Sequence, residues 1–160
     1  MDTEVQLESF IARFSDEVAD GARAAIGRLR ALLPAAQVLV YDNYGYLAVG
    51  FGLTEKASEA VFSIAVYPRW LNLFFQHGYR LDDPDGLLKG DGSRVRHIQC
   101  RGPEVFDDPR VRALMDQALV DTPWLRDAAT PGRVVIKSIS AKQRPRRPAR
   151  RVVAGSAEEP

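Results

Sequence analysis

Two neighbouring strand-like runs, joined by a tight turn, constrain the fold of this chain more than any other feature. Residues 61–67 (VFSIAVY) and 70–75 (WLNLFF) are rich in β-branched and aromatic residues, with Pro68 and Arg69 between them. Because strand side chains alternate between two faces, one face is predicted to carry Phe62, Ile64, Val66, Leu71, Leu73 and Phe75, and the other Tyr67, Trp70, Asn72 and Phe74. With aromatics on both faces, cover is expected over the second face too, from a loop, the C-terminus, a partner or a ligand.

The chain before these runs is typical of two helices and a hairpin. An apolar stripe at helical spacing is formed by Leu7, Phe10, Ile11 and Phe14. Ser15, followed by two acidic residues, predicts the N-cap of a second helix, and Pro34 ends it. Residues 38–41 and 46–51 flank Asp-Asn-Tyr-Gly and predict a hairpin.

The chain after these runs predicts a strand, a helix and a last strand. Residues 94–100 are strand-like, and Asp108 followed by Pro109 is a favoured helix start. Trp124 is expected to pack back onto the body as an anchor. Residues 134–139 (VVIKSI) are the late strand candidate.

Grouped strands with helices at both ends predict an α+β domain. We expect two layers, with helices packed on one face of a mainly antiparallel sheet of 4–6 strands. Residues 1–140 are assigned to this single domain. Residues 141–160 are assigned to a basic, Pro/Arg-rich tail that is extended or disordered, because from Lys142 onward six basic side chains face only two acidic ones.

Composition also bears on where the protein works. Cys100 is the single cysteine, so an internal disulfide is excluded and a reducing compartment is favoured. The first residues lack the pattern of a secretory signal, and no apolar run approaches the ~20 residues of a membrane span. A soluble, cytoplasmic protein without membrane contact is expected.

The first candidate site is a groove formed by the second sheet face, which carries Trp70, and by the segment of residues 87–96 with its glycine-rich turn. Aromatic side chains can line a pocket for a planar ligand, and the basic side chains can bind an anion. The candidate ligand-binding residues are Tyr41, Tyr44, Tyr67, Trp70, Phe74, Lys89, Arg94, Arg96 and His97. The spacing is not that of a P-loop. The plainer alternative is core aromatics beside a tight turn with exposed basic residues.

Two alternative sites involve charged clusters. Iron or another divalent cation could be held by His77, Asp82, Asp83 and Asp85, although an acidic turn around Pro84 is an ordinary solvated structure. Nucleic-acid phosphates could be bound by the tail residues Lys142, Arg144, Arg146, Arg147, Arg150 and Arg151. The tail itself has no aromatic residue for base stacking, and a solvated tail is its plainer interpretation.

Catalysis finds little support in the sequence. Cys100 follows His97 by three positions in a predicted strand, so the two side chains point to opposite faces and cannot form a nucleophile–base pair without a bulge. No Gly-x-Ser-x-Gly motif occurs. We therefore expect a protein that binds rather than catalyses.

Residues ~30–120 resemble the YdhG-like domain of unknown function, a small bacterial family related in fold to frataxin-like, iron-chaperone-like proteins. The resemblance is carried by residues 40–44 (VYDNY), 62–70 (FSIAVYPRW), 73–75 (LFF), Gly78, 81–84 (LDDP), 87–90 (LLKG) and 94–98 (RVRHI). It implies the same α+β fold and no established enzymatic activity. Frataxin-type iron handling relies on an acidic ridge along an N-terminal helix. The first two predicted helices and their junction hold the acidic residues Glu4, Glu8, Asp16, Glu17 and Asp20, but also Arg13, Arg23, Arg28 and Arg30.

These observations give one leading expectation for function and two alternatives. The leading expectation is a non-enzymatic domain that binds an anionic small molecule or a protein partner. The alternatives are metal handling and nucleic-acid association through the tail. A homodimer is expected if the second sheet face is bare.

Overall fold

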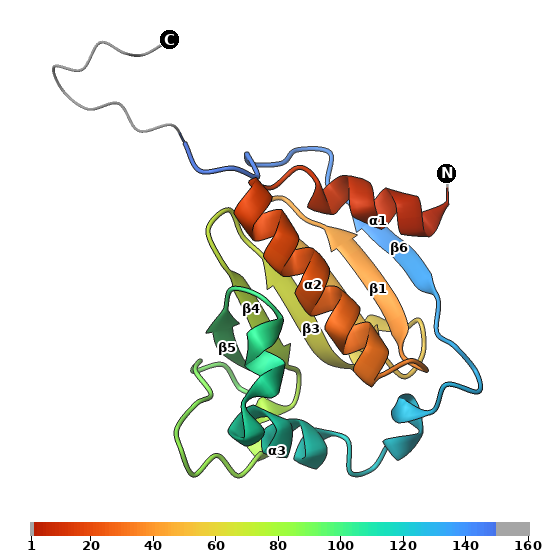
Figure 1. Ribbon diagram of the computed structural model, residues 1–160, viewed down its shortest axis with the longest axis vertical. Coiled ribbons are helices and arrows are strands. Elements are labelled where there is room, and N and C mark those ends of the chain that lie inside the picture. Colours follow the sequence, from red (N-terminus) through yellow and green to blue (C-terminus); the bar gives the residue numbers. More distant parts are fainter. Residues whose placement is uncertain (1, 150–160) are drawn as a thin grey trace, which may run out of the picture.

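The computed structural model describes residues 2–149 as a two-layer α+β domain (Figure 1). The helices are α1 (Thr3–Ile11), α2 (Asp16–Leu32) and α3 (Pro109–Ala118). The strands are β1 (Gln37–Asp42), β2 (Leu47–Gly52), β3 (Ala60–Val66), β4 (Leu71–Phe75), β5 (Arg96–Cys100) and β6 (Val134–Ile139). The predicted α+β class and two-layer arrangement are confirmed.

The six strands form one open sheet in the order β5-β4-β3-β2-β1-β6. The first five pair with antiparallel neighbours, whereas β6 pairs parallel to β1 at the other edge. The late strand predicted at residues 134–139 is therefore confirmed. Its parallel pairing carries the end of the chain back to the β1–β2 turn.

The helices cover one face of this sheet (Figure 1). The caps act as expected, because the Ser15 side chain accepts a hydrogen bond from the Val18 N–H and Asp108 accepts from Arg110. The predicted helical stripe is buried, and the inward residues of β3 and β4 are at most 1% exposed. The strand alternation read from the sequence is thus the alternation in the fold. The expectation for Trp124 is wrong, because its neighbour Leu125 is buried while Trp124 is 47% exposed.

The C-terminal strap, residues 140–149, differs from the expected tail. Its backbone hydrogen-bonds to the β1–β2 hairpin, with Ser140 N–H donating to the Asp42 carbonyl and Arg144 N–H to the Tyr44 carbonyl, both at 2.8 Å. Arg146 as a whole residue is only 4% exposed. The predicted boundary at residue 140 is corrected for residues 141–149, which pack on the body. The predicted tail residues Arg150 and Arg151 lie outside the described residues.

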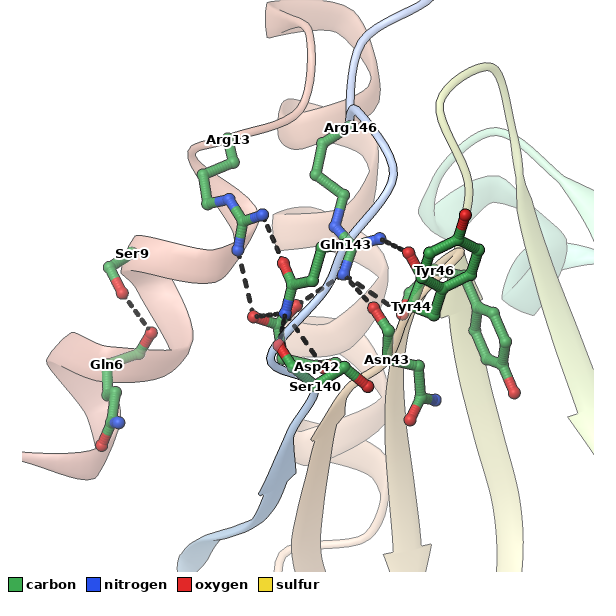
Figure 2. A network of polar contacts seen from close by, with 10 residues as sticks. All are labelled: Gln6, Ser9, Arg13, Asp42, Asn43, Tyr44, Tyr46, Ser140, Gln143 and Arg146. Carbon is green, nitrogen blue, oxygen red and sulfur yellow. Dashed lines mark hydrogen bonds and ion pairs between the residues drawn. The ribbon is translucent and has the colours of Figure 1, made fainter.

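A buried ion pair holds the strap in place (Figure 2). An Arg146 nitrogen lies 2.7 Å from Asp42 Oδ1, and the two side chains are 2% and 1% exposed. Arg13 lies 3.0 Å from the other Asp42 oxygen, and Gln143 Nε2 donates to the same oxygen at 2.9 Å. Arg146 also donates to the Asn43 carbonyl and stacks on the Phe14 ring at 5.7 Å. One acidic residue thus joins β1, the end of α1 and the strap.

Candidate functional site

The outward sheet face, opposite the helices, carries the candidate site. Register pairs Leu39 with Gly50, Gly50 with Ser63, Ser63 with Phe74, and Phe74 with His97, so these side chains form one row across the sheet. The next row contains Tyr41, Ala48, Ala65, Asn72 and Gln99. The centre of the face is therefore built from small side chains, with larger ones on either side.

These small residues leave a depression of about 380 Å³ in the face. Its floor includes Ala48, Gly50, Ser63 and Ala65, and its remaining lining residues are Leu39, Tyr41, Asn43, Tyr46, Ala57, Ala60, Tyr67, Phe74, Gln76 and Val95. A volume of this size falls within the range of small-molecule sites. None of its lining residues is charged, so the depression itself suits a flat, largely apolar ligand.

The β2–β3 loop forms one wall of the depression, to which it contributes Ala57. Glu55 of this loop forms an ion pair with Arg133 at 2.9 Å, and its carbonyl accepts from Lys137 Nζ at 2.8 Å. The loop therefore reaches across β1 to β6, and Leu39 on the outward face is fully buried. The cover expected over the second face is partly supplied by the chain itself.

Neutral polar groups surround the aromatic lining. Gln76 Nε2 donates to Ser63 Oγ at 3.0 Å. Burial raises the pKa of both Tyr41 and Tyr67, so the two phenols stay protonated as hydrogen-bond donors at neutral pH. The Tyr41 hydroxyl is buried and has no hydrogen-bond partner within residues 2–149. A buried donor without a hydrogen-bond partner is uncommon, so the Tyr41 hydroxyl is a candidate contact for a ligand.

The predicted aromatic residues are brought together in part. Tyr41, Tyr67 and Phe74 line the depression. Trp70 lies just outside it, stacked on Tyr67 with ring centroids 5.6 Å apart. Tyr44 lies in the β1–β2 turn, apart from the depression, and is 57% exposed. In that turn its carbonyl accepts a hydrogen bond from the strap. Asn43, Ser63 and Gln76 also line the depression and were not predicted, because the prediction selected aromatic and charged residues. Tyr46 lines it too and was not predicted although it is aromatic.

The predicted basic residues divide between the two faces of the sheet. Lys89 forms an antiparallel bridge with His97, so both side chains project from the outward face of the sheet. The His97 ring packs on Phe74, with ring centroids 5.3 Å apart. Arg96 precedes His97 in β5 and therefore points to the opposite face, where it donates to the Gly92 and Val95 carbonyls. Arg94 is exposed in the loop before β5. Only Lys89 and His97 thus extend the aromatic face as the predicted groove required.

The predicted metal ligands do not converge. Asp83 accepts hydrogen bonds from the Leu87 and Leu88 N–H groups at 3.0 and 2.9 Å, which fixes the turn around Pro84. Asp82 binds Gln117 through its backbone, and Asp85 and His77 are exposed. Within residues 2–149, no three His, Cys, Asp or Glu side chains are grouped to hold a metal ion. Iron binding by these residues stays a prediction.

A larger cleft of about 590 Å³ lies between the end of α3 and the strands β3 and β4. Among the predicted site residues it contains only His77, and it combines apolar side chains such as Val61 and Leu81 with charges of both signs. It has neither the aromatic cluster nor an unpartnered buried donor. The depression on the outward face is therefore the stronger candidate site.

The lone thiol gives a testable prediction about the inner face of β5. Cys100 pairs with the inward residue Leu71, and burial, with a smaller contribution from Glu104, raises its pKa to about 11. We expect the native thiol to react with iodoacetamide far more slowly at pH 8 than the urea-unfolded chain, with the native rate still rising above pH 10. A native rate that levels off near pH 8.5, the ordinary thiol range, would contradict this placement.

Comparisons with known proteins add no relative. Scans against models of protein families and searches of curated proteins and of solved structures found no match to this chain. The resemblance to the YdhG-like family therefore stays a prediction. Within residues 2–149, no helix is long and apolar enough to cross a membrane.

Proposed function

We propose that this protein is a binding domain whose outward sheet face accepts a planar small molecule carrying an acidic group. The observation that carries the proposal is the depression itself, with a floor of small side chains between the aromatic residues Tyr41, Tyr67 and Phe74. Aromatic walls around a flat floor match the shape and polarisability of a planar ring system. No catalytic group is required by this function.

The polar groups of the face give the ligand an orientation. The partly exposed Tyr41 side chain holds a hydroxyl without a partner, which a small rotation of the ring would offer to a ligand acceptor. At the opposite side, His97 and Lys89 follow Phe74 in the same row, and adjacent strands are about 5 Å apart. A ring system lying between Tyr67 and Phe74 would direct an acidic substituent toward this basic end.

Filling the depression tests the proposal. Ala48 is half-buried in the middle of the floor, so Ala48→Phe places a ring where the ligand would lie while keeping a good strand residue. Naphthoate and naphthamide serve as a charged and a neutral planar probe. We expect naphthoate near 100 times its Kd to raise the melting temperature of the native chain by several degrees, since this adds about 2.7 kcal/mol of stability. Ala48→Phe should abolish that shift.

The matched control is Ser138→Phe. Ser138 is exposed on the same face, opposite Tyr41 in β6, but does not line the depression. This variant should keep the full naphthoate shift. A weaker response to naphthamide would support the basic end formed by Lys89 and His97. An equal naphthoate shift in the native chain and in Ala48→Phe, or no shift with either probe, would overturn the proposed site.

A further inference from the structure

A second cleft, of about 410 Å³, lies where the strap passes the β3–β4 turn. We call it the strap cleft. Its lining residues are Gly45, Tyr67, Pro68, Arg69, Trp70, Arg144, Pro145, Arg147, Pro148 and Ala149. The cleft is thus lined by the β3–β4 turn, by the strap more than 70 residues later in the sequence, and by Gly45 of the β1–β2 turn. It exists only because the strap packs on the body.

An aromatic column forms one wall of the strap cleft. Tyr46 stacks on Tyr67 with centroids 5.4 Å apart and planes 26° apart, and Tyr67 stacks on Trp70 at 5.6 Å and 28°. Trp70 is partly buried and lines the cleft, and no further ring within residues 2–149 stacks on it. The end of this column is a platform on which another flat ring can stack.

Arginines surround this platform. Arg69 comes from the β3–β4 turn, and Arg144 and Arg147 come from the strap; all three are exposed. No acidic residue lines the cleft, and none of the three arginines forms an ion pair within the described part of the chain. The backbone around Arg144 and Arg147 is held by the buried Arg146 and by the hydrogen bond from Arg144 N–H to the Tyr44 carbonyl, and the turn that carries Arg69 is closed by the hydrogen bond from Tyr67 N–H to the Trp70 carbonyl. The result is an ordered positive site beside an accessible indole ring.

We infer that the strap cleft binds single-stranded nucleic acid. One base stacks on Trp70, while backbone phosphates pair with Arg69, Arg144 and Arg147. Exposed rings combined with exposed cations along a groove are the features by which proteins bind single strands without sequence preference. The aromatic residue that the strap lacks in its own sequence is supplied by the β3–β4 turn.

The same features argue against two related ligands. A duplex keeps its bases stacked on one another, so it cannot cover the Trp70 ring without unpairing. A free nucleotide site normally encloses its ligand with converging polar groups, whereas the polar side chains of the strap cleft are exposed arginines. A nucleic-acid single strand that continues past the cleft can contact both Arg69 of the β3–β4 turn and the arginines of the strap.

Fluorescence anisotropy with a fluorescein-labelled oligo(dT) of about ten nucleotides tests the inference, since single-strand sites span about 4–16 nucleotides. The full chain is titrated at about 50 mM and about 200 mM KCl. We expect Trp70→Leu to weaken binding about tenfold without changing the salt dependence, because it removes stacking and no charge. Arg144→Gln combined with Arg147→Gln should lower the slope of log K against log salt by about 1.4, that is, ~0.7 for each phosphate contact of a single strand.

The control is Lys56→Gln combined with Arg80→Gln, which removes the same charge at the other end of β3 and β4. It should leave both affinity and slope close to those of the native chain. Far-UV circular dichroism and melting curves confirm that each variant is folded. Absence of oligo(dT) binding at about 50 mM salt, equal losses in the control and the arginine variant, or unchanged affinity in Trp70→Leu would each overturn the inference. So would a duplex of the same length, or adenosine monophosphate alone, that binds as tightly as oligo(dT).

Discussion

Replacing Arg146 by methionine should lower the free energy of unfolding by about 3–5 kcal/mol, because it leaves a buried carboxylate without its main partner. Asp42 is 1% exposed, and its carboxylate would keep only the side chains of Arg13 and Gln143 as hydrogen-bond partners. For a domain of this size the loss corresponds to a fall in melting temperature of about 10 °C or more. Thermal unfolding followed by circular dichroism gives this value directly.

Two further variants show whether the loss of stability comes from the buried ion pair or from any change in the strap. Arg147→Met removes a neighbouring charge that is exposed, so it should change stability by no more than about 0.5 kcal/mol. Asp42→Asn combined with Arg146→Met removes the stranded charge and should recover part of the loss. If Arg146→Met melts within about 2 °C of the native chain, the packed strap is contradicted.

Replacing Gly21 by alanine should destabilise the domain by about 2 kcal/mol or more, although alanine is the better helix former. Gly21 faces the segment after β5 so closely that a β-carbon would lie 2.0 Å from the Arg101 carbonyl oxygen. The Arg101 backbone cannot move away from an added β-carbon as a flexible side chain could. Helix α2 would therefore have to shift from residues 101–102.

Gly27 in the same helix is the matched control. A β-carbon at Gly27 meets nothing within 4 Å, so Gly27→Ala should stabilise the domain by up to about 1 kcal/mol through helix propensity alone. Urea unfolding of the two variants should thus give midpoints on opposite sides of the native value. Two variants that change stability in the same direction would show that α2 does not approach Arg101 as closely as described.

The fold was largely predictable because its signals are local. Alternation in β3 and β4, the Ser15 and Asp108 caps and the 134–139 strand each depend on a few adjacent residues, and each is present in the fold. The parallel pairing of β1 with β6 joins segments almost 100 residues apart, and no local pattern specifies it. The tail prediction was wrong for residues 141–149 for the same reason, since a run of arginine and proline is normally solvated unless a distant acid is placed to bury one arginine.

The candidate site was predictable in its aromatic part only. Tyr41, Tyr67 and Phe74 were selected by residue type, and strand register brings them to one depression. Arg96 was assigned to the same groove by charge, but strand alternation turns it to the other face. The floor was missed because alanine, glycine and serine carry no chemical signal. In β3, Ser63 and Ala65 alternate with Phe62, Ile64 and Val66, and this alternation was the available indication of a flat, open face.

A titration of isotope-labelled protein with naphthoate, followed through the chemical shifts of the backbone amides, shows directly whether the ligand binds to the outward sheet face. We expect the largest chemical-shift changes at Ala48, Ser63 and Ala65 on the floor and at Phe74 on the wall of the depression. Ala48→Phe should remove these changes, while the rest of its spectrum remains that of a folded protein. Shifts that cluster instead around Leu81 and Val120 in the cleft beside α3, or no shifts at all, would contradict the outward sheet face as the binding site.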